Sequence, residues 1–120
     1  MSEQPRDLVE RTFKFALQTR QFVNRLPRSL ANYEDVRQLV RLSGSVAANY
    51  LESQEGLSRK DFFYRFKICR KESRESGLWL RLLDLGTDAS LFTERDRLLA
   101  ESEELKKTFS SIAGKDDTGE

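Results

Sequence analysis

The chain has 120 residues, of which 38% are hydrophobic and 34% charged, with two prolines and six glycines. This composition excludes a largely disordered chain, and the length fits one helix-rich globular domain spanning residues 1–120. The formal net charge of +1 predicts no strong overall attraction to nucleic acid or to a membrane surface.

The sequence has no N-terminal apolar run that resembles a signal peptide. No segment approaches the roughly 18 apolar residues that a membrane-spanning helix needs. We therefore expect a cytoplasmic protein with no membrane partner. The single cysteine, Cys69, excludes an intramolecular disulfide, and its apolar neighbours favour a small core residue over a nucleophile.

The first predicted helix spans residues 6–26 and ends before Pro27, which disfavours helical geometry in the residue preceding it. Its apolar residues follow helical spacing but cover more than one narrow stripe. They are Leu8, Val9, Phe13, Phe15, Ala16, Leu17, Phe22, Val23 and Leu26. A face this wide predicts contacts on two sides and therefore a homo-oligomer.

The second predicted helix spans residues 33–55, with Asn32 and Asp35 as a capping box and Gly56 as its C-terminal stop. Its expected inward residues are Val36, Leu39, Val40, Val46, Ala47, Tyr50 and Leu51. Small residues in its middle, around Gly44, permit close approach of a neighbouring helix. Ser73 and Gly77, four residues apart, are the candidate matching strip.

The third predicted helix spans residues 59–85, between a Ser58 cap and Gly86. Stepping 100° per residue divides it into an apolar arc and a basic arc. The apolar arc holds Phe62, Phe66, Ile68, Cys69, Trp79, Leu80 and Leu83. The basic arc holds Lys60, Lys67, Arg70, Lys71, Arg74 and Arg81.

The fourth predicted helix spans residues 93–112, begins with Thr93 and Asp96, and is followed by a solvated tail at 114–120. Four helices joined by short loops predict an all-α fold, an antiparallel up-down-up-down four-helix bundle.

Inward carboxylates in such bundles often hold paired metal ions, which makes Glu52, Glu72 and Glu75 candidate ligands. The chain has no histidine, so the imidazole ligands of a di-iron site are missing. It also lacks a nucleophile with a histidine base and a phosphate-binding glycine loop. We expect no catalytic residues, no metal and no cofactor, and hence no enzyme.

Glu72 lies within the apolar arc, with Glu75 at its edge, and a carboxylate there needs a polar partner. We expect a buried polar network that fixes the register of the helices. Its candidate members are Arg41, Asn49, Glu52, Arg65, Glu72 and Glu75.

The basic arc predicts a nucleic-acid interface, because residues 57–83 carry 8 basic and 3 acidic groups. Lys60, Lys67, Lys71 and Arg74 share one face, with Arg70 and Arg81 nearby, and present cations to a phosphate backbone. The alternative is an ordinary solvated face, partly neutralised by residues 84–120, which carry 5 basic and 10 acidic groups. No exposed aromatic is expected among these cations, so binding should be weakly sequence-specific.

Two stretches carry a family resemblance. They read S-x-x-A-N-x-x-E from Ser45 to Glu52 and K-E-S-x-E-S-x-x-W-L-x-L-L from Lys71 to Leu83. The chain resembles the bacterial four helix bundle family, which includes the 23S rRNA-intervening-sequence protein and is similar to the accessory variability determinant of diversity-generating retroelements. The resemblance implies a homopentamer with no known catalysis and a nucleic-acid role. Its retroelement branch implies a basic barrel that binds a reverse transcriptase and RNA or DNA.

Two functions therefore stay open. One is a nucleic-acid-binding scaffold that acts through the basic third helix. The other is a protein-interaction or assembly module, in which the basic third helix and acidic fourth helix recognise a protein partner or neighbouring protomers.

Overall fold

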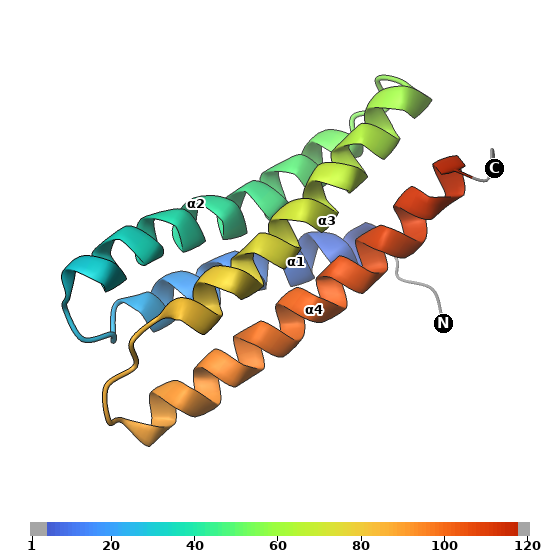
Figure 1. The fold of residues 1–120 in the computed structure, drawn as a ribbon. Coiled ribbons are helices and arrows are strands. Elements are labelled where there is room, and N and C mark those ends of the chain that lie inside the picture. The colour runs from blue at the N-terminus through green and yellow to red at the C-terminus, as the bar shows by residue number, and fades with distance from the viewer. Residues whose placement is uncertain (1–4, 118–120) are drawn as a thin grey trace.

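The computed structural model describes residues 5–117, with the side chains of residues 7–115. Within this range the chain forms four helices and no strand. They are α1 (Pro5–Val23), α2 (Leu30–Ser53), α3 (Arg59–Leu82) and α4 (Ala89–Asp117). Each helix runs antiparallel to the next (Figure 1), which confirms the predicted all-α up-down-up-down bundle.

The four helices enclose one core. α3 packs between α2 and α4, and α1 contacts α2 and, less extensively, α4. Figure 1 shows that the α1–α2 and α3–α4 loops share one end of the bundle and the α2–α3 loop lies at the other.

An aromatic cluster joins three helices in the core. The ring of Phe66 in α3 lies 5.8 Å from that of Tyr50 in α2 and 5.7 Å from that of Phe109 in α4, measured between centroids. These distances are in the favourable range for aromatic pairs. The cluster therefore packs α2, α3 and α4 against one another.

Cys69 is a core residue, as its place on the apolar arc predicted. Its side chain is fully buried, and Sγ lies 3.5 Å from the carbonyl oxygen of Val46. Burial, and secondarily the nearby charge of Glu72, raises the pKa of the Cys69 thiol to about 12. The thiol is therefore protonated, and a poor nucleophile, at neutral pH.

α1 ends three residues earlier than predicted. The backbone N–H groups of Arg25 and Leu26 donate to the carbonyls of Phe22 and Val23, so a tight turn replaces the last helical turn. This turn brings the chain out of helical geometry ahead of Pro27.

α2 begins at Leu30 rather than at Tyr33, because Ser29 is its N-cap. The Ser29 hydroxyl oxygen accepts the backbone N–H of Asn32 at 3.0 Å. The capping role predicted for Asn32 is wrong, since its own side chain bonds elsewhere.

α3 begins as predicted, with the Ser58 hydroxyl accepting the N–H of Asp61. It ends at Leu82, three residues before the predicted boundary, and Leu83 is extended, with φ −64° and ψ 140°. Leu83 and Leu85 are both buried. The chain therefore leaves helical geometry after Leu82 while both leucines remain packed in the core.

α4 begins at Ala89, four residues before the predicted start. The carboxylate of Asp88 accepts hydrogen bonds from the N–H and the hydroxyl of Ser90, as an N-cap side chain does. The helix also continues to Asp117, so the predicted tail is helical at residues 114–117, while residues 118–120 lie outside the described range. Ala113, in this last part of the helix, is fully buried.

Two packing predictions need correction. A Cβ at Gly77 would lie 3.1 Å from Ser102 Oγ of α4, and one at Gly44 would lie 2.9 Å from Nη2 of Arg20 in α1. Gly77 of α3 therefore faces α4, and Gly44 of α2 faces α1, rather than one another. Leu51, expected to point inward, is exposed.

The wide apolar face of α1 is divided between the core and the surface. Phe15 and Phe22 are buried, whereas Phe13 and Leu17, one turn apart, are 55% and 41% exposed. These two side chains form an outward apolar pair on the bundle.

Candidate nucleic-acid interface

The six cations predicted for the interface lie along the outside of α3, a set we call the basic row. Lys60, Lys71, Arg74 and Arg81 are exposed, and Lys67 and Arg70 are half-buried. At 1.5 Å per residue the row is about 30 Å long. Within the row, Lys71 Nζ lies 3.8 Å from Glu75 Oε2 in a largely solvent-exposed pair, which neutralises this one charge only weakly.

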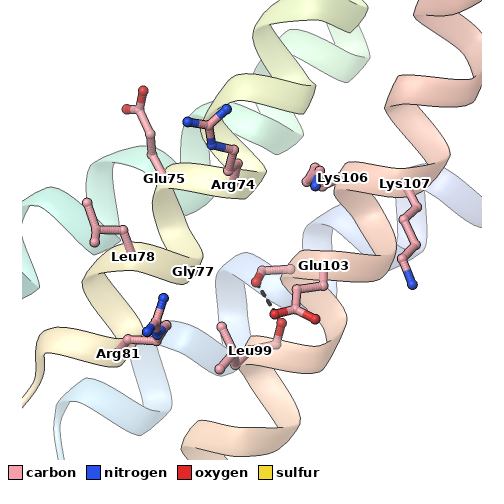
Figure 2. Close-up of a pocket in the computed structure, with 10 residues that line it drawn as sticks. Arg74, Glu75, Gly77, Leu78, Arg81, Leu99, Glu103, Lys106 and Lys107 are labelled. Atoms are coloured by element: carbon pink, nitrogen blue, oxygen red, sulfur yellow. Dashed lines mark hydrogen bonds between the residues drawn. The ribbon is translucent and has the colours of Figure 1, made fainter.

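The basic row continues into a groove between α3 and α4 with a volume of about 400 Å³. Figure 2 shows Arg74, Gly77 and Arg81 of α3 along one side, and Leu99, Glu103, Lys106 and Lys107 of α4 along the other. Gly77 permits this arrangement, because it has no side chain to hold the two helices apart. Two lysines of the acidic helix thus line the same groove as two arginines of the basic row.

Among the acidic groups of α4 with described partners, Glu101 pairs with α1, whereas Glu94 and Asp96 pair with arginines of α4 itself. Arg11 Nη2 of α1 lies 3.0 Å from Glu101 Oε1. Arg97 Nη2 lies 2.7 Å from Glu94 Oε2 and donates to Gln18 of α1 at 2.9 Å. The hydrogen bond from Arg97 lowers the pKa of the Glu94 carboxyl.

Glu104 also lies on the α1 side, where it lines a hollow together with Arg11 and Lys14. The groove beside the basic row contains Glu75 and Glu103 as its acidic lining residues. Glu101 and Glu104 of the fourth helix are therefore directed toward α1, whereas Glu103 lines the groove beside the basic row.

Sequence reasoning missed Tyr64, an exposed aromatic within the basic row. Its side chain is 58% exposed, and it lines a hollow of about 350 Å³ with Arg59, Lys60 and Lys67. The expectation that the row lacks an exposed aromatic was therefore wrong. The sequence spacing indicates this position for Tyr64, because it lies four residues after Lys60 and three before Lys67, on the same helical face.

Part of the predicted polar network joins α2 to α3. The hydroxyl of Ser45 donates to Glu72 Oε1 at 2.6 Å, and Asn49 Nδ2 lies 3.5 Å from the same oxygen. Arg65 Nη1 donates to Asn49 Oδ1 at 2.9 Å, and Arg65 Nε lies 3.5 Å from Asp61 Oδ1. These side chains are half-buried rather than buried.

Three predicted members of the network lie outside it. Arg41 is exposed and donates to Gln38, Glu52 is exposed, and Glu75 faces Lys71 on its own helix. Helical phase placed Glu72 toward α2 correctly, but it did not show that Ser45, rather than Arg41, would reach it.

Among the helices described here, none is long and apolar enough to cross a membrane. The side chains described include no cluster of three or more Cys, Asp or Glu residues that could hold a metal ion.

Comparison with known proteins finds similarity at the level of the fold. No protein-family model matches the chain, and no curated protein sequence does so. The structure is similar to that of a protein of unknown function from the S23 ribosomal protein family of Bacteroides thetaiotaomicron VPI-5482, with a TM-score of 0.72. The match covers 88% of this chain and 97% of that chain at 24% sequence identity. The two chains therefore share a fold.

Proposed function

We propose that this protein is a non-catalytic oligomeric scaffold that binds RNA or DNA, with weak sequence specificity, through the basic row. The observation that carries the proposal is that Lys106 and Lys107 line the same groove as Arg74 and Arg81, while the carboxylate of Glu101 pairs with Arg11 of α1. A nucleic-acid backbone is the polyanion that a row of this kind neutralises.

The form of the basic row favours a polymer over a small anion. Its cations recur along about 30 Å of helix, which suits a ligand with regularly repeated charge. Phosphate contacts orient a protein on nucleic acid but do not read its sequence, so a row made mainly of cations supports weak sequence specificity.

We also infer that the chain is related to the bacterial four helix bundle family, which its two motifs resemble. The shared fold with a protein from the S23 ribosomal protein family supports this relationship. The family implies a homopentamer, and its retroelement branch implies a reverse transcriptase as partner. The exposed pair of Phe13 and Leu17 supports an oligomer, because association would bury both side chains.

The test is fluorescence anisotropy with duplex DNA, single-stranded RNA and structured RNA at about 50 mM salt, followed by a salt titration. Four phosphate contacts on duplex DNA should give a log-log slope of roughly −3.6, or about −0.9 per contact. Replacing Lys60, Lys67, Lys71 and Arg74 by Gln should flatten the slope and weaken binding to all sequences alike.

A matched control removes the same number of charges elsewhere. Lys14, Arg28, Arg37 and Arg41 are exposed cations of α1, α2 and the loop between them. Their replacement by Gln should leave the salt slope close to that of the original protein. If both variants lost the same affinity for nucleic acid, the loss would reflect overall charge, which would contradict an interface on α3. If no probe binds at tens of micromolar protein, the proposal is wrong.

The second candidate function is a protein-interaction or assembly module without nucleic acid. The observation that favours it is the outward pair of Phe13 and Leu17. Light scattering gives the mass of the particle, and a value near the 14.0 kDa of one chain would contradict self-assembly. An oligomer that Phe13→Ser and Leu17→Ser dissociate, and that binds none of the three nucleic acids, would favour this function.

A further inference from the structure

The hollow around Tyr64 differs from the rest of the basic row in chemistry. The four residues that line it are one aromatic ring and three cations: Tyr64, Arg59, Lys60 and Lys67. The guanidinium of Arg59 lies over the ring of Phe63, 4.8 Å from its centroid, which holds Arg59 against the bundle. The nearby carboxylate of Asp61 is directed to Arg65, on the side that faces α2.

This combination matches the chemistry of single-stranded nucleic-acid binding. Proteins that bind single strands combine cations that follow the backbone with aromatic rings on which bases stack. The bases of a duplex are stacked on one another and paired, so an aromatic ring on a helix surface has no free base face to contact. A single strand can turn a base toward the protein.

We propose that Tyr64 stacks on a base of single-stranded RNA or DNA while Lys60 and Lys67 contact the flanking phosphates, so that the protein prefers single strands to duplexes. This inference rests on the proposed nucleic-acid function and specifies its ligand. The strand continues along Lys71 and Arg74 toward the groove with Lys106 and Lys107, where its phosphates are neutralised.

The experiment measures the affinity of the full chain for an unstructured strand of about 12 nucleotides, as RNA and as DNA, and for the duplex of the same sequence. Tyr64→Ala should weaken single-strand binding by roughly 5- to 160-fold, the effect of losing one base–aromatic stack, and leave duplex binding unchanged. Tyr64→Phe should retain the single-strand affinity, because the ring remains. The salt slope should stay the same in Tyr64→Ala, since no phosphate contact is lost.

Tyr33 provides a matched control. It is 64% exposed on α2, with the guanidinium of Arg37 6.0 Å from its ring centroid, and it lies outside the basic row. Tyr33→Ala should leave single-strand affinity unchanged. If the original protein binds nucleic acid but Tyr64→Ala weakens neither form, or weakens both equally, stacking by Tyr64 is wrong while the proposed function stands. If the original protein binds neither form, the proposed function fails and this inference with it.

Discussion

Asn32 and Asp84, which are 52 residues apart, form a pair of reciprocal hydrogen bonds at one end of the bundle. Asn32 Nδ2 donates to the carbonyl oxygen of Asp84 at 2.8 Å, and the N–H of Asp84 donates to Asn32 Oδ1 at 2.9 Å. Asn32 Nδ2 also donates to the carbonyl oxygen of Pro27 at 2.9 Å. One side-chain amide, 3% exposed, thus ties the α1–α2 loop to the chain between α3 and α4.

Asn32→Ala should lower the free energy of unfolding by about 3 kcal/mol, because it leaves three backbone groups without their partner in a poorly hydrated site. Urea unfolding followed by the fluorescence of Trp79 measures this change. Asn24→Ala, at an exposed position in the turn after α1, is the control and should change stability by less than about 0.5 kcal/mol. Similar midpoints for the two variants would contradict a stabilising role for Asn32.

Glu72→Ala should destabilise the protein more than Glu104→Ala. Glu72 accepts the hydroxyl of Ser45 at 2.6 Å, whereas Glu104 is exposed. Because Glu72 is half-buried, we expect a loss of about 1–2 kcal/mol, below the value for a fully buried ion pair. The Glu104 variant should lose less than about 0.5 kcal/mol.

Thermal unfolding of the two glutamate variants checks this difference. Glu72→Gln should retain part of the stability, since its side-chain oxygen still accepts the Ser45 hydroxyl. Equal melting temperatures for Glu72→Ala and Glu104→Ala would mean that the contact with Ser45 contributes nothing.

Cys69 should make the folded protein less stable as the pH rises above 9. The thiol pKa is about 12 when folded and close to the ordinary 9.0 when unfolded, so only the unfolded chain releases this proton in between. Below pH 9 the thiol makes its full contribution to the free energy of unfolding. Above pH 9 that free energy falls by about 1.4 kcal/mol per pH unit.

The measurement is the free energy of urea unfolding at several pH values between 8 and 10.5 for the original protein and for Cys69→Ala. The original protein should show the steeper decline, because the alanine variant lacks this titration while other groups titrate in both. Parallel curves would contradict the raised pKa of the thiol.

Asp88→Ala should lower the melting temperature, because the Asp88 carboxylate accepts the N–H of Ser90 at the start of α4. Thr93→Ala should change it little, since Thr93 lies one turn inside the helix and donates only to the carbonyl of Ala89, at an exposed site. Circular dichroism during heating compares the two variants. A larger fall in melting temperature for Thr93→Ala would contradict capping by Asp88 and favour the predicted helix start at Thr93.

Local sequence patterns determined much of this protein. Periodic apolar residues predicted the four helices, and the capping pattern placed Ser58 at the start of α3. Helical spacing at 100° per residue also predicted that Cys69 lies in the core and the basic row on the outside. These features depend on neighbours within one helix, which is the range over which sequence spacing is informative.

Tertiary structure decided how the helices meet. Helical phase does not reveal the rotation of one helix against another, and packing at Gly77 brings Lys106 beside Arg74. The same rotation turns Glu101 of α4 toward Arg11 of α1. Asn32 likewise carried a local capping pattern, but its side chain instead makes two hydrogen bonds to Asp84, between α3 and α4, and one to Pro27. Ser29 is the cap. Contacts between residues far apart in sequence therefore determine which way Glu101 of α4 points and how the loops are joined at one end of the bundle.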